Sequence, residues 1–196
     1  MQGAPSGHTV IALVASAGGL AAVSRVLGDL PERFPASVLV LIHQATDRVS
    51  ALVALLGRAS ALPVVAGEHG RRLEPGRVVV VPPGTHLLVT PTLETALIAS
   101  GAAPPSRPSA DLLLTSLAVS VGRRAVAVVL SGGGHDGATG ATAIHVLGGR
   151  VLATDEATSE AFGMPQATIE REGVINQVLP LGDMAAALAS VASTPA

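Results

Sequence analysis

The sequence predicts an α/β fold with a doubly wound, mostly parallel sheet, an antiparallel hairpin at one edge and three α/β/α layers. Apolar runs rich in β-branched residues alternate with segments of helical spacing along most of the chain. The first run, Val10–Ala15, leads directly into Ser16-Ala17-Gly18-Gly19, which is typical of a buried central strand that turns sharply into a helix. No internal repeat or linker interrupts the 196 residues. We therefore expect one Rossmann-like domain over 1–196, with its core at about 9–192.

The amino-acid composition excludes several classes of catalysis and binding. Hydrophobic residues make up 48% of the chain and cysteine is absent, which predicts a globular fold and excludes thiol catalysis, thiolate metal sites and disulfides. Lysine is also absent, so a lysine nucleophile is excluded. A net charge of −2 with two Phe and no Trp or Tyr argues against nucleic-acid binding. No apolar run approaches the roughly 20 residues of a membrane helix, and the start lacks a signal peptide, so we expect a cytoplasmic protein without membrane insertion.

The other elements follow from the same patterns. Strands are predicted at 37–42, 63–66, 77–81, 86–89, 93–99, 124–130, 151–153 and 174–179, and helices at about 20–28, 50–58, 111–121 and 183–191. The glycine-rich turn 131–140 is expected to lead into a further helix through Ala143, Ile144 and Leu147. Pro82-Pro83-Gly84 predicts that 77–81 and 86–89 pair as the antiparallel hairpin. The Pro-rich segment 101–110 is predicted to be a loop, either a connector or a flap beside a site, and Ser109 is expected to cap the helix that follows.

Three strand ends carry residues with catalytic chemistry. Ser16 follows the first strand, His43 follows the second, and the glycine-rich turn after 124–130 contains Asp136. The carboxyl ends of parallel strands lie at one edge of a sheet, where ligands bind in such folds. A serine, an imidazole and a carboxylate together can act as nucleophile, general base and orienting group. Spacing alone therefore allows a serine hydrolase, without establishing it.

Each of these residues also has a simpler interpretation. Ser16 suits a helix N-cap, or one wall of a phosphate site; His43 suits a structural role; and Asp136 suits a cap on the following helix. A metal site from His43, His135 and Asp136 is a further alternative, although no recognised ligand spacing supports it. No metal and no organic cofactor is expected. The remaining histidines are expected on the surface or in turns: His8, His69, His86 and His145.

Six segments in order resemble the catalytic domain of the chemotaxis protein-glutamate methylesterase family. They are V-A-S-A-G-G at 14–19, L-I-H at 41–43, P-P-G-T-H-L-L-V at 82–89, R-P-S-A-D-L-L at 107–113, L-S-G-G-G-H-D-G-A at 130–138 and F-G-M-P at 162–165. The resemblance spans roughly Val10 to Leu188. It implies a doubly wound α/β sheet with a hairpin, and hydrolysis of glutamate γ-methyl esters on a methyl-accepting chemoreceptor, with deamidation of receptor glutamine as a second activity.

The resemblance also assigns residues. It puts the family's serine nucleophile on Ser16, its histidine on His43 and its aspartate on Asp136. The backbone amides of His43 and Gly133 are the candidate oxyanion donors. Two further positions, Ala17 and Gly134, are the neighbouring candidates for oxyanion and substrate binding.

The chain departs from the family pattern in four places. One is Gln44-Ala45-Thr46 after His43, in place of a proline-bearing loop. Gly133 stands where the family commonly has methionine, and Val14 replaces the first glycine before the serine. Only about nine residues precede the first strand, where the family usually carries a receiver domain. We therefore expect receiver-domain control to be absent or to come from a separate chain. The competing hypotheses are a binding module of the same fold without catalysis, and a nucleotide-binding protein that uses the two glycine-rich turns.

Overall fold

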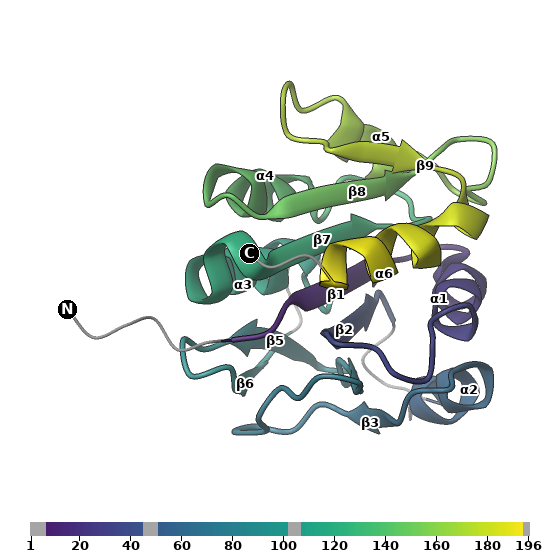
Figure 1. Cartoon of the computed structure of the whole chain (residues 1–196). Coiled ribbons are helices and arrows are strands. Elements are labelled where there is room, and N and C mark those ends of the chain that lie inside the picture. The colour runs from purple at the N-terminus through teal and green to yellow at the C-terminus, as the bar shows by residue number, and fades with distance from the viewer. Residues whose placement is uncertain (1–6, 45–50, 102–106, 194–196) are drawn as a thin grey trace.

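The computed structural model describes residues 7–44, 51–101 and 107–193. In this part of the chain seven parallel strands form one sheet in the order β3-β4-β2-β1-β7-β8-β9 (Figure 1). Their bounds are β1 Val10–Ala15, β2 Ser37–Ile42, β3 Val64–Ala66, β4 Val78–Val80, β7 Ala125–Val129, β8 Arg150–Thr154 and β9 Gln177–Leu179. The predicted class, a mostly parallel α/β sheet, is confirmed.

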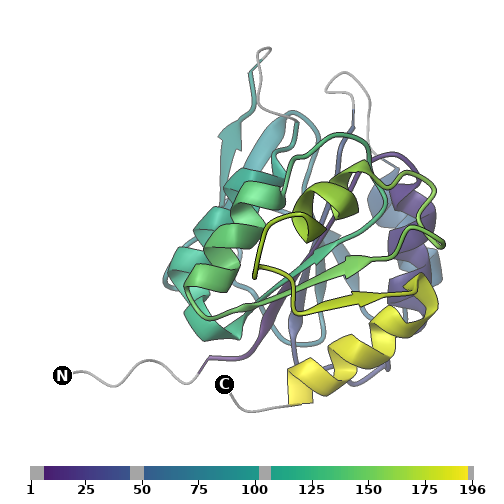
Figure 2. The same cartoon turned by 90° about the horizontal axis from the view of Figure 1, so that it is seen from above.

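Helices cover both faces of this sheet, so the domain has three layers (Figure 2). One face carries α1 (Gly19–Gly28), α2 (Leu52–Ala59) and α6 (Met184–Ser193). The other carries α3 (Ala110–Val121), α4 (Ala138–Val146) and α5 (Gly163–Ile169), together with the hairpin β5–β6. The short helix α5, which follows Phe162, was not among the predicted helices.

The central strand β1 shows why its sequence is apolar at every position. Val10, Ala12 and Val14 pack in the hydrophobic cluster that includes α3 and α4. The alternate residues Ile11, Leu13 and Ala15 pack in the cluster that includes α1 and α6, and all six are fully buried. A strand with helices on both faces has no polar side, because successive side chains point to opposite faces.

The hairpin is present, but the prediction of its strands is wrong. Val78–Val80 (β4) pairs in parallel with β2 and β3 inside the main sheet. The antiparallel partner of β5 (Thr85–Val89) is β6 (Thr95–Ala99), and the two form a separate sheet rather than an edge of the main one. Three consecutive valines buried on both faces are typical of a parallel strand, and this pattern outweighs the Pro-Pro-Gly turn that follows it.

The arrangement brings the predicted strand ends to one edge. β1 lies between β2 and β7, and its pairing with β2 ends at Ala15 opposite Ile42. Ser16 and His43 are therefore the next positions on two adjacent parallel strands. Strands β1 to β4 form one half of the sheet and β7 to β9 form the other. The strand order therefore reverses between β1 and β7, and ligands bind at such a point in open α/β sheets. Residues 102–106 of the predicted 101–110 loop lie outside the described residues.

Candidate active site

Ser16 is held by backbone hydrogen bonds on both sides of its turn. Its N–H donates to the Ser131 carbonyl at 2.9 Å, and its own carbonyl accepts from Gly19 N–H at 2.9 Å. The N-cap of α1 is Gly18, which has φ +72° and gives no side-chain cap. Ser16 therefore does not cap the helix. Among the described residues its hydroxyl has no hydrogen-bond partner.

The Ser16 turn opens into a cavity of about 530 Å³. Its walls come from the turn itself, from the start of α1 and from the loop before α5: Ser16, Gly18, Gly19, Leu20, Ala21, Ile42 and Glu160. Ser16 is half-buried, whereas Ala17 and Leu20 are exposed at the rim. A partnerless hydroxyl beside an accessible cavity can meet an external ligand.

His43 is fixed at the end of β2. Its N–H donates to the Ala15 carbonyl at 3.0 Å, which continues the β1–β2 ladder by one bond. Its ring is 17% exposed, and Nε2 lies 2.8 Å from Asp136 Oδ2. An ionised carboxylate only accepts hydrogen bonds, so Nε2–H is the donor and the other ring nitrogen, Nδ1, carries the free lone pair. Adjacent strands lie about 4.8 Å apart, so the backbones of Ser16 and His43 are neighbours at this edge.

Asp136 is buried and surrounded by donors. Besides His43, Oδ2 accepts the N–H of Ala110 at 2.7 Å. Oδ1 accepts the N–H of Asp111 at 3.0 Å and the Ser109 hydroxyl at 3.3 Å. These groups are the first turn of α3 and its N-cap, so Asp136 binds the positive end of a helix.

The environment lowers the pKa of Asp136. Burial by itself raises the pKa of the carboxyl group. The hydrogen bonds from His43 and from the amides of Ala110 and Asp111, with the charge of the imidazole, outweigh burial and hold the pKa below its ordinary value. The carboxylate is thus ionised near neutral pH and can stabilise a protonated His43 ring.

Asp136 caps a helix, but not the helix that was predicted. The prediction that it caps the following helix is wrong, because the N-cap of α4 is Gly137 without a side-chain bond. Asp136 caps α3, and Asp111 of α3 in turn accepts the amides of Gly137 and Gly140 at 3.0 and 2.8 Å. The two aspartates tie the starts of α3 and α4 together. Ser109 caps α3 as predicted, accepting the Leu112 amide at 3.3 Å.

The candidate oxyanion donors divide into two groups. The amide of His43 is already bonded to Ala15, so the expectation that it serves an oxyanion is wrong. The amides of Ala17, Gly133 and Gly134 donate to no group within the described residues, and all three residues are exposed beside the site. Backbone N–H groups of this kind can meet the oxygen of an incoming carbonyl.

Gly132 and Ser131 hold the glycine-rich turn against Ser16. A Cβ on Gly132 would collide with Met164 Sδ and lie 3.0 Å from Ser16 Cβ and Ser16 N, so a larger residue there would require Met164 and the Ser16 turn to move. The buried Ser131 hydroxyl donates to the Ala17 carbonyl at 2.7 Å and accepts the Ala161 amide at 2.9 Å. No role was predicted for this serine, although it directly follows the predicted strand 124–130.

The prediction of a surface or turn position for His86 is wrong. It is 4% exposed on β5, and its Nδ1 accepts the Ser109 amide at 3.0 Å, which anchors the start of α3. The expected surface position holds for His69 and His145, whereas His8 is part-buried and bonded to Ser37 Oγ at 2.6 Å. The signal for His86 was its place directly before the apolar run Leu87–Val89.

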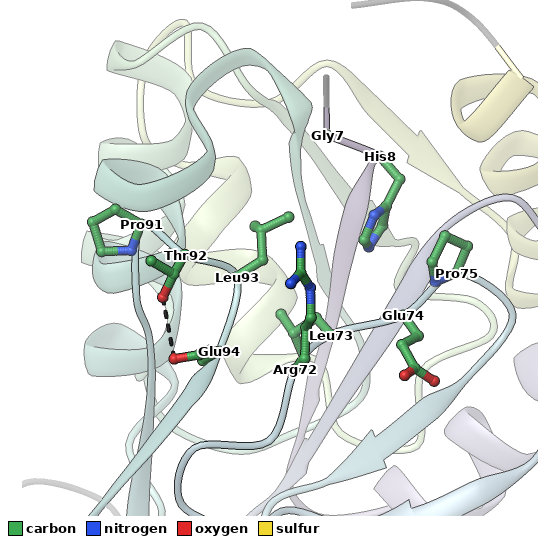
Figure 3. A pocket seen from close by; sticks show the side chains of 10 residues that line it. All are labelled: Gly7, His8, Arg72, Leu73, Glu74, Pro75, Pro91, Thr92, Leu93 and Glu94. Carbon is green, nitrogen blue, oxygen red and sulfur yellow. Dashed lines mark hydrogen bonds between the residues drawn. The ribbon is translucent and has the colours of Figure 1, made fainter. Parts of the chain in front are cut away.

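A second cavity, of about 580 Å³, lies at the start of β1, at the opposite end of the sheet (Figure 3). Burial, then the charges of Arg124 and Arg72, lower the pKa of His8 there. Its two acidic side chains have partners: Glu74 pairs with Arg77 at 3.1 Å, outside the cavity, and Glu94 accepts a hydrogen bond from the Thr92 hydroxyl at 3.2 Å within it. The imidazole of His8 is bonded to the Ser37 hydroxyl, but Ser37 is fully buried and does not line this cavity, whereas Ser16 lines its own.

The described ranges hold neither a metal-binding cluster nor a membrane-spanning helix. Between residues 7 and 193, leaving out 45–50 and 102–106, no three His, Asp or Glu side chains gather closely enough to hold a metal ion. This applies to the predicted alternative of His43, His135 and Asp136, in which His135 is exposed. None of the helices in the same ranges is long and apolar enough to span a bilayer.

Comparison with known proteins gives one consistent family. A model of the CheB methylesterase family matches residues 11–188. The protein-glutamate methylesterase FrzG of Myxococcus xanthus is 40% identical over 184 residues, which are 94% of this chain and 55% of that protein. A protein-glutamate methylesterase/protein-glutamine glutaminase 2 of Anaeromyxobacter dehalogenans is 41% identical over 182 residues, which are 91% of this chain and 52% of that protein. The chain thus spans about half the length of the curated relatives it matches.

A solved structure agrees over nearly its whole length. The crystal structure of the Thermotoga maritima CheB methylesterase catalytic domain superimposes with a TM-score of 0.89 at 30% identity. The match covers 94% of this chain and 99% of the other.

Proposed function

The chain belongs to the CheB methylesterase family, and from that premise we propose that it is a serine esterase that hydrolyses glutamate γ-methyl esters on chemoreceptor-like proteins. Ser16 is the proposed nucleophile, His43 the general base and Asp136 the group that orients His43. The supporting observation is the contact of His43 Nε2 with Asp136 Oδ2 at 2.8 Å, because it leaves Nδ1 unprotonated on the strand next to a partnerless serine hydroxyl.

The proposed reaction has two stages. Ser16 Oγ attacks the γ-carbonyl of the ester while His43 Nδ1 takes its proton, and the amides of Ala17, Gly133 and Gly134 receive the developing oxyanion. His43 then gives the proton to the departing methoxide, so methanol leaves and an acyl-serine remains. A water molecule attacks this acyl group with His43 again as base, which releases the glutamate and restores Ser16.

Asp136 contributes through charge. Protonation of His43 in each stage creates an imidazolium 2.8 Å from a buried carboxylate, whose lowered pKa keeps it ionised. The same site can take a glutamine side chain, with ammonia as the leaving group. We include glutaminase activity in the proposal because relatives of this chain carry both names.

The substrate and regulator belong to the same proposal. Receptor glutamates as substrate place the reaction in the cytoplasm. The curated relatives extend well beyond the region matched here, so we propose that a receiver-domain protein controls access to the Ser16 cavity. Adding a phosphorylated receiver protein and measuring turnover tests that part.

Methanol release from a methylated receptor fragment tests the activity. The wild-type protein should release methanol, and Ser16→Ala should reduce release by several orders of magnitude with an unchanged fold. Wild-type turnover in Ser16→Ala would contradict the proposal. A folded wild-type protein that neither releases methanol nor reacts with a fluorophosphonate would instead indicate a binding module without catalysis.

A further inference from the structure

The cavity beside Ser16 has one ionisable wall. Glu160 is the only Asp, Glu, Arg or His among the described residues that line it; the other walls are backbone, aliphatic side chains and the Ser16 hydroxyl. Glu160 lies in the loop between β8 and α5, far from Ser16 in sequence. Its position follows from the Ser131 hydroxyl, which accepts the adjacent Ala161 amide and donates to the Ala17 carbonyl, so the two loops lie side by side.

Glu160 reaches the serine turn itself. A Cβ placed on Gly18 would lie 2.7 Å from Glu160 Cβ and 2.9 Å from its carboxylate oxygen Oε2. The side chain therefore lies against Gly18, two residues after the proposed nucleophile. It is exposed, and in the part of the chain that the structure describes its carboxylate forms no ion pair and no hydrogen bond. Its negative charge is thus uncompensated and faces whatever enters the cavity.

We propose that Glu160 makes this site select glutamyl methyl esters that lie next to a basic side chain. The inference rests on the proposed esterase function. The ester is neutral and is indifferent to the charge of Glu160, whereas an arginine or lysine beside it in the substrate would be attracted. An exposed pair of opposite charges about 5 Å apart gives a few-fold gain in binding, and salt weakens it. Glu160 is accordingly a specificity residue, and the chemistry remains with Ser16 and His43.

Peptides that differ in one flanking residue test the inference. Each carries a single glutamate γ-methyl ester flanked by arginine, glutamine or glutamate, and methanol release gives kcat/KM at low and at high salt. We expect the wild-type protein to favour the arginine peptide over the glutamine peptide by about threefold to tenfold at low salt. The preference should appear mainly in KM and decline at high salt.

Three variants separate the possible outcomes. Glu160→Gln should remove the preference for the arginine peptide over the glutamine peptide, and Glu160→Lys should favour the glutamate peptide. Glu156→Gln is the matched control, because Glu156 is an exposed glutamate of the same loop that does not line the cavity. It should keep the wild-type preference.

The results distinguish this inference from the one on which it rests. An unchanged preference in Glu160→Gln, or equal loss in Glu156→Gln, overturns the role of Glu160 and leaves the esterase intact. If the wild-type protein hydrolyses none of the three peptides, both the role of Glu160 and the proposed esterase function are overturned.

Discussion

The two halves of the candidate site are built differently. The half around Asp136 is fully bonded, with a buried carboxylate that accepts hydrogen bonds from His43, Ser109, Ala110 and Asp111. The half around Ser16 is open, with a hydroxyl that has no partner among the described residues. The bonded half fixes the orientation of the base in advance, whereas the open half leaves its polar groups to the substrate. Substitutions should therefore separate stability from activity according to the half they touch.

The largest effect is expected from Ser16→Ala. It removes the proposed nucleophile without breaking any hydrogen bond of the described fold, so activity should decline by about 10⁵-fold while the unfolding free energy changes by less than about 0.5 kcal/mol. Methanol release and thermal unfolding, measured on the same preparation, check both parts. A large loss of stability would show that the serine half is structural.

Asp136→Ala should lower both quantities. The His43 ring loses its orienting partner, and we expect activity to decline by about 10³- to 10⁴-fold. The amides of Ala110 and Asp111 lose their acceptor at the start of α3, which should cost about 1–2 kcal/mol. Denaturant unfolding beside the activity assay tests this. Stability equal to that of Ser16→Ala would remove the contrast between the halves.

Substitutions at Gly133 test the open half through its backbone. Gly133→Pro removes the N–H and should reduce kcat by about 10²- to 10³-fold, the effect of one lost oxyanion donor. Gly133→Ala is the matched control, because a Cβ there meets nothing within 4 Å and the N–H remains. It should retain nearly full activity. Equal losses in the two variants would indicate that the shape of the turn matters and its amide does not.

The smallest effect is a pH dependence of stability. The pKa of Asp136 is lowered below its ordinary value of 3.8, so the unfolded chain binds this proton more readily than the folded one. The carboxylate therefore contributes its stability above the ordinary pKa, and the contribution is lost as the pH falls through the lowered one. We expect the difference in unfolding free energy between wild type and Asp136→Asn to be larger at pH 7 than at about pH 3. A difference independent of pH would contradict the assigned hydrogen bonds.

The sequence was most informative where burial dictates composition. Apolar runs located β1 and β2 to the residue, because strands covered on both faces are almost wholly apolar; the one polar residue, Ser37 at the start of β2, is bonded to His8. The hairpin was assigned to the wrong strand because a Pro-Pro-Gly turn is a local signal, whereas strand pairing depends on the whole sheet. The turn before β6, at 90–94, could not be predicted, because Leu93 has a φ of +60° and leucine rarely adopts this conformation.

The candidate site divides in the same way. The sequence could predict that Ser16, His43 and Asp136 lie at one edge of the sheet, because each follows a strand and the carboxyl ends of parallel strands meet there. The acceptor of each amide could not be foreseen, so the His43 amide was counted as free although it completes the ladder with Ala15. Glu160 and Ser131 approach the serine from loops far away in sequence, and only packing reveals such contacts.

The central claim is that His43, oriented by Asp136, activates the Ser16 hydroxyl. Labelling with a fluorophosphonate, followed by mass spectrometry of peptides, tests it most directly because it does not require knowledge of the substrate. We predict a single adduct on Ser16 in the wild-type protein, formed at least about 100-fold more slowly in a folded His43→Gln variant. An adduct at another residue, or equal labelling of Ser16 in both proteins, would contradict the account.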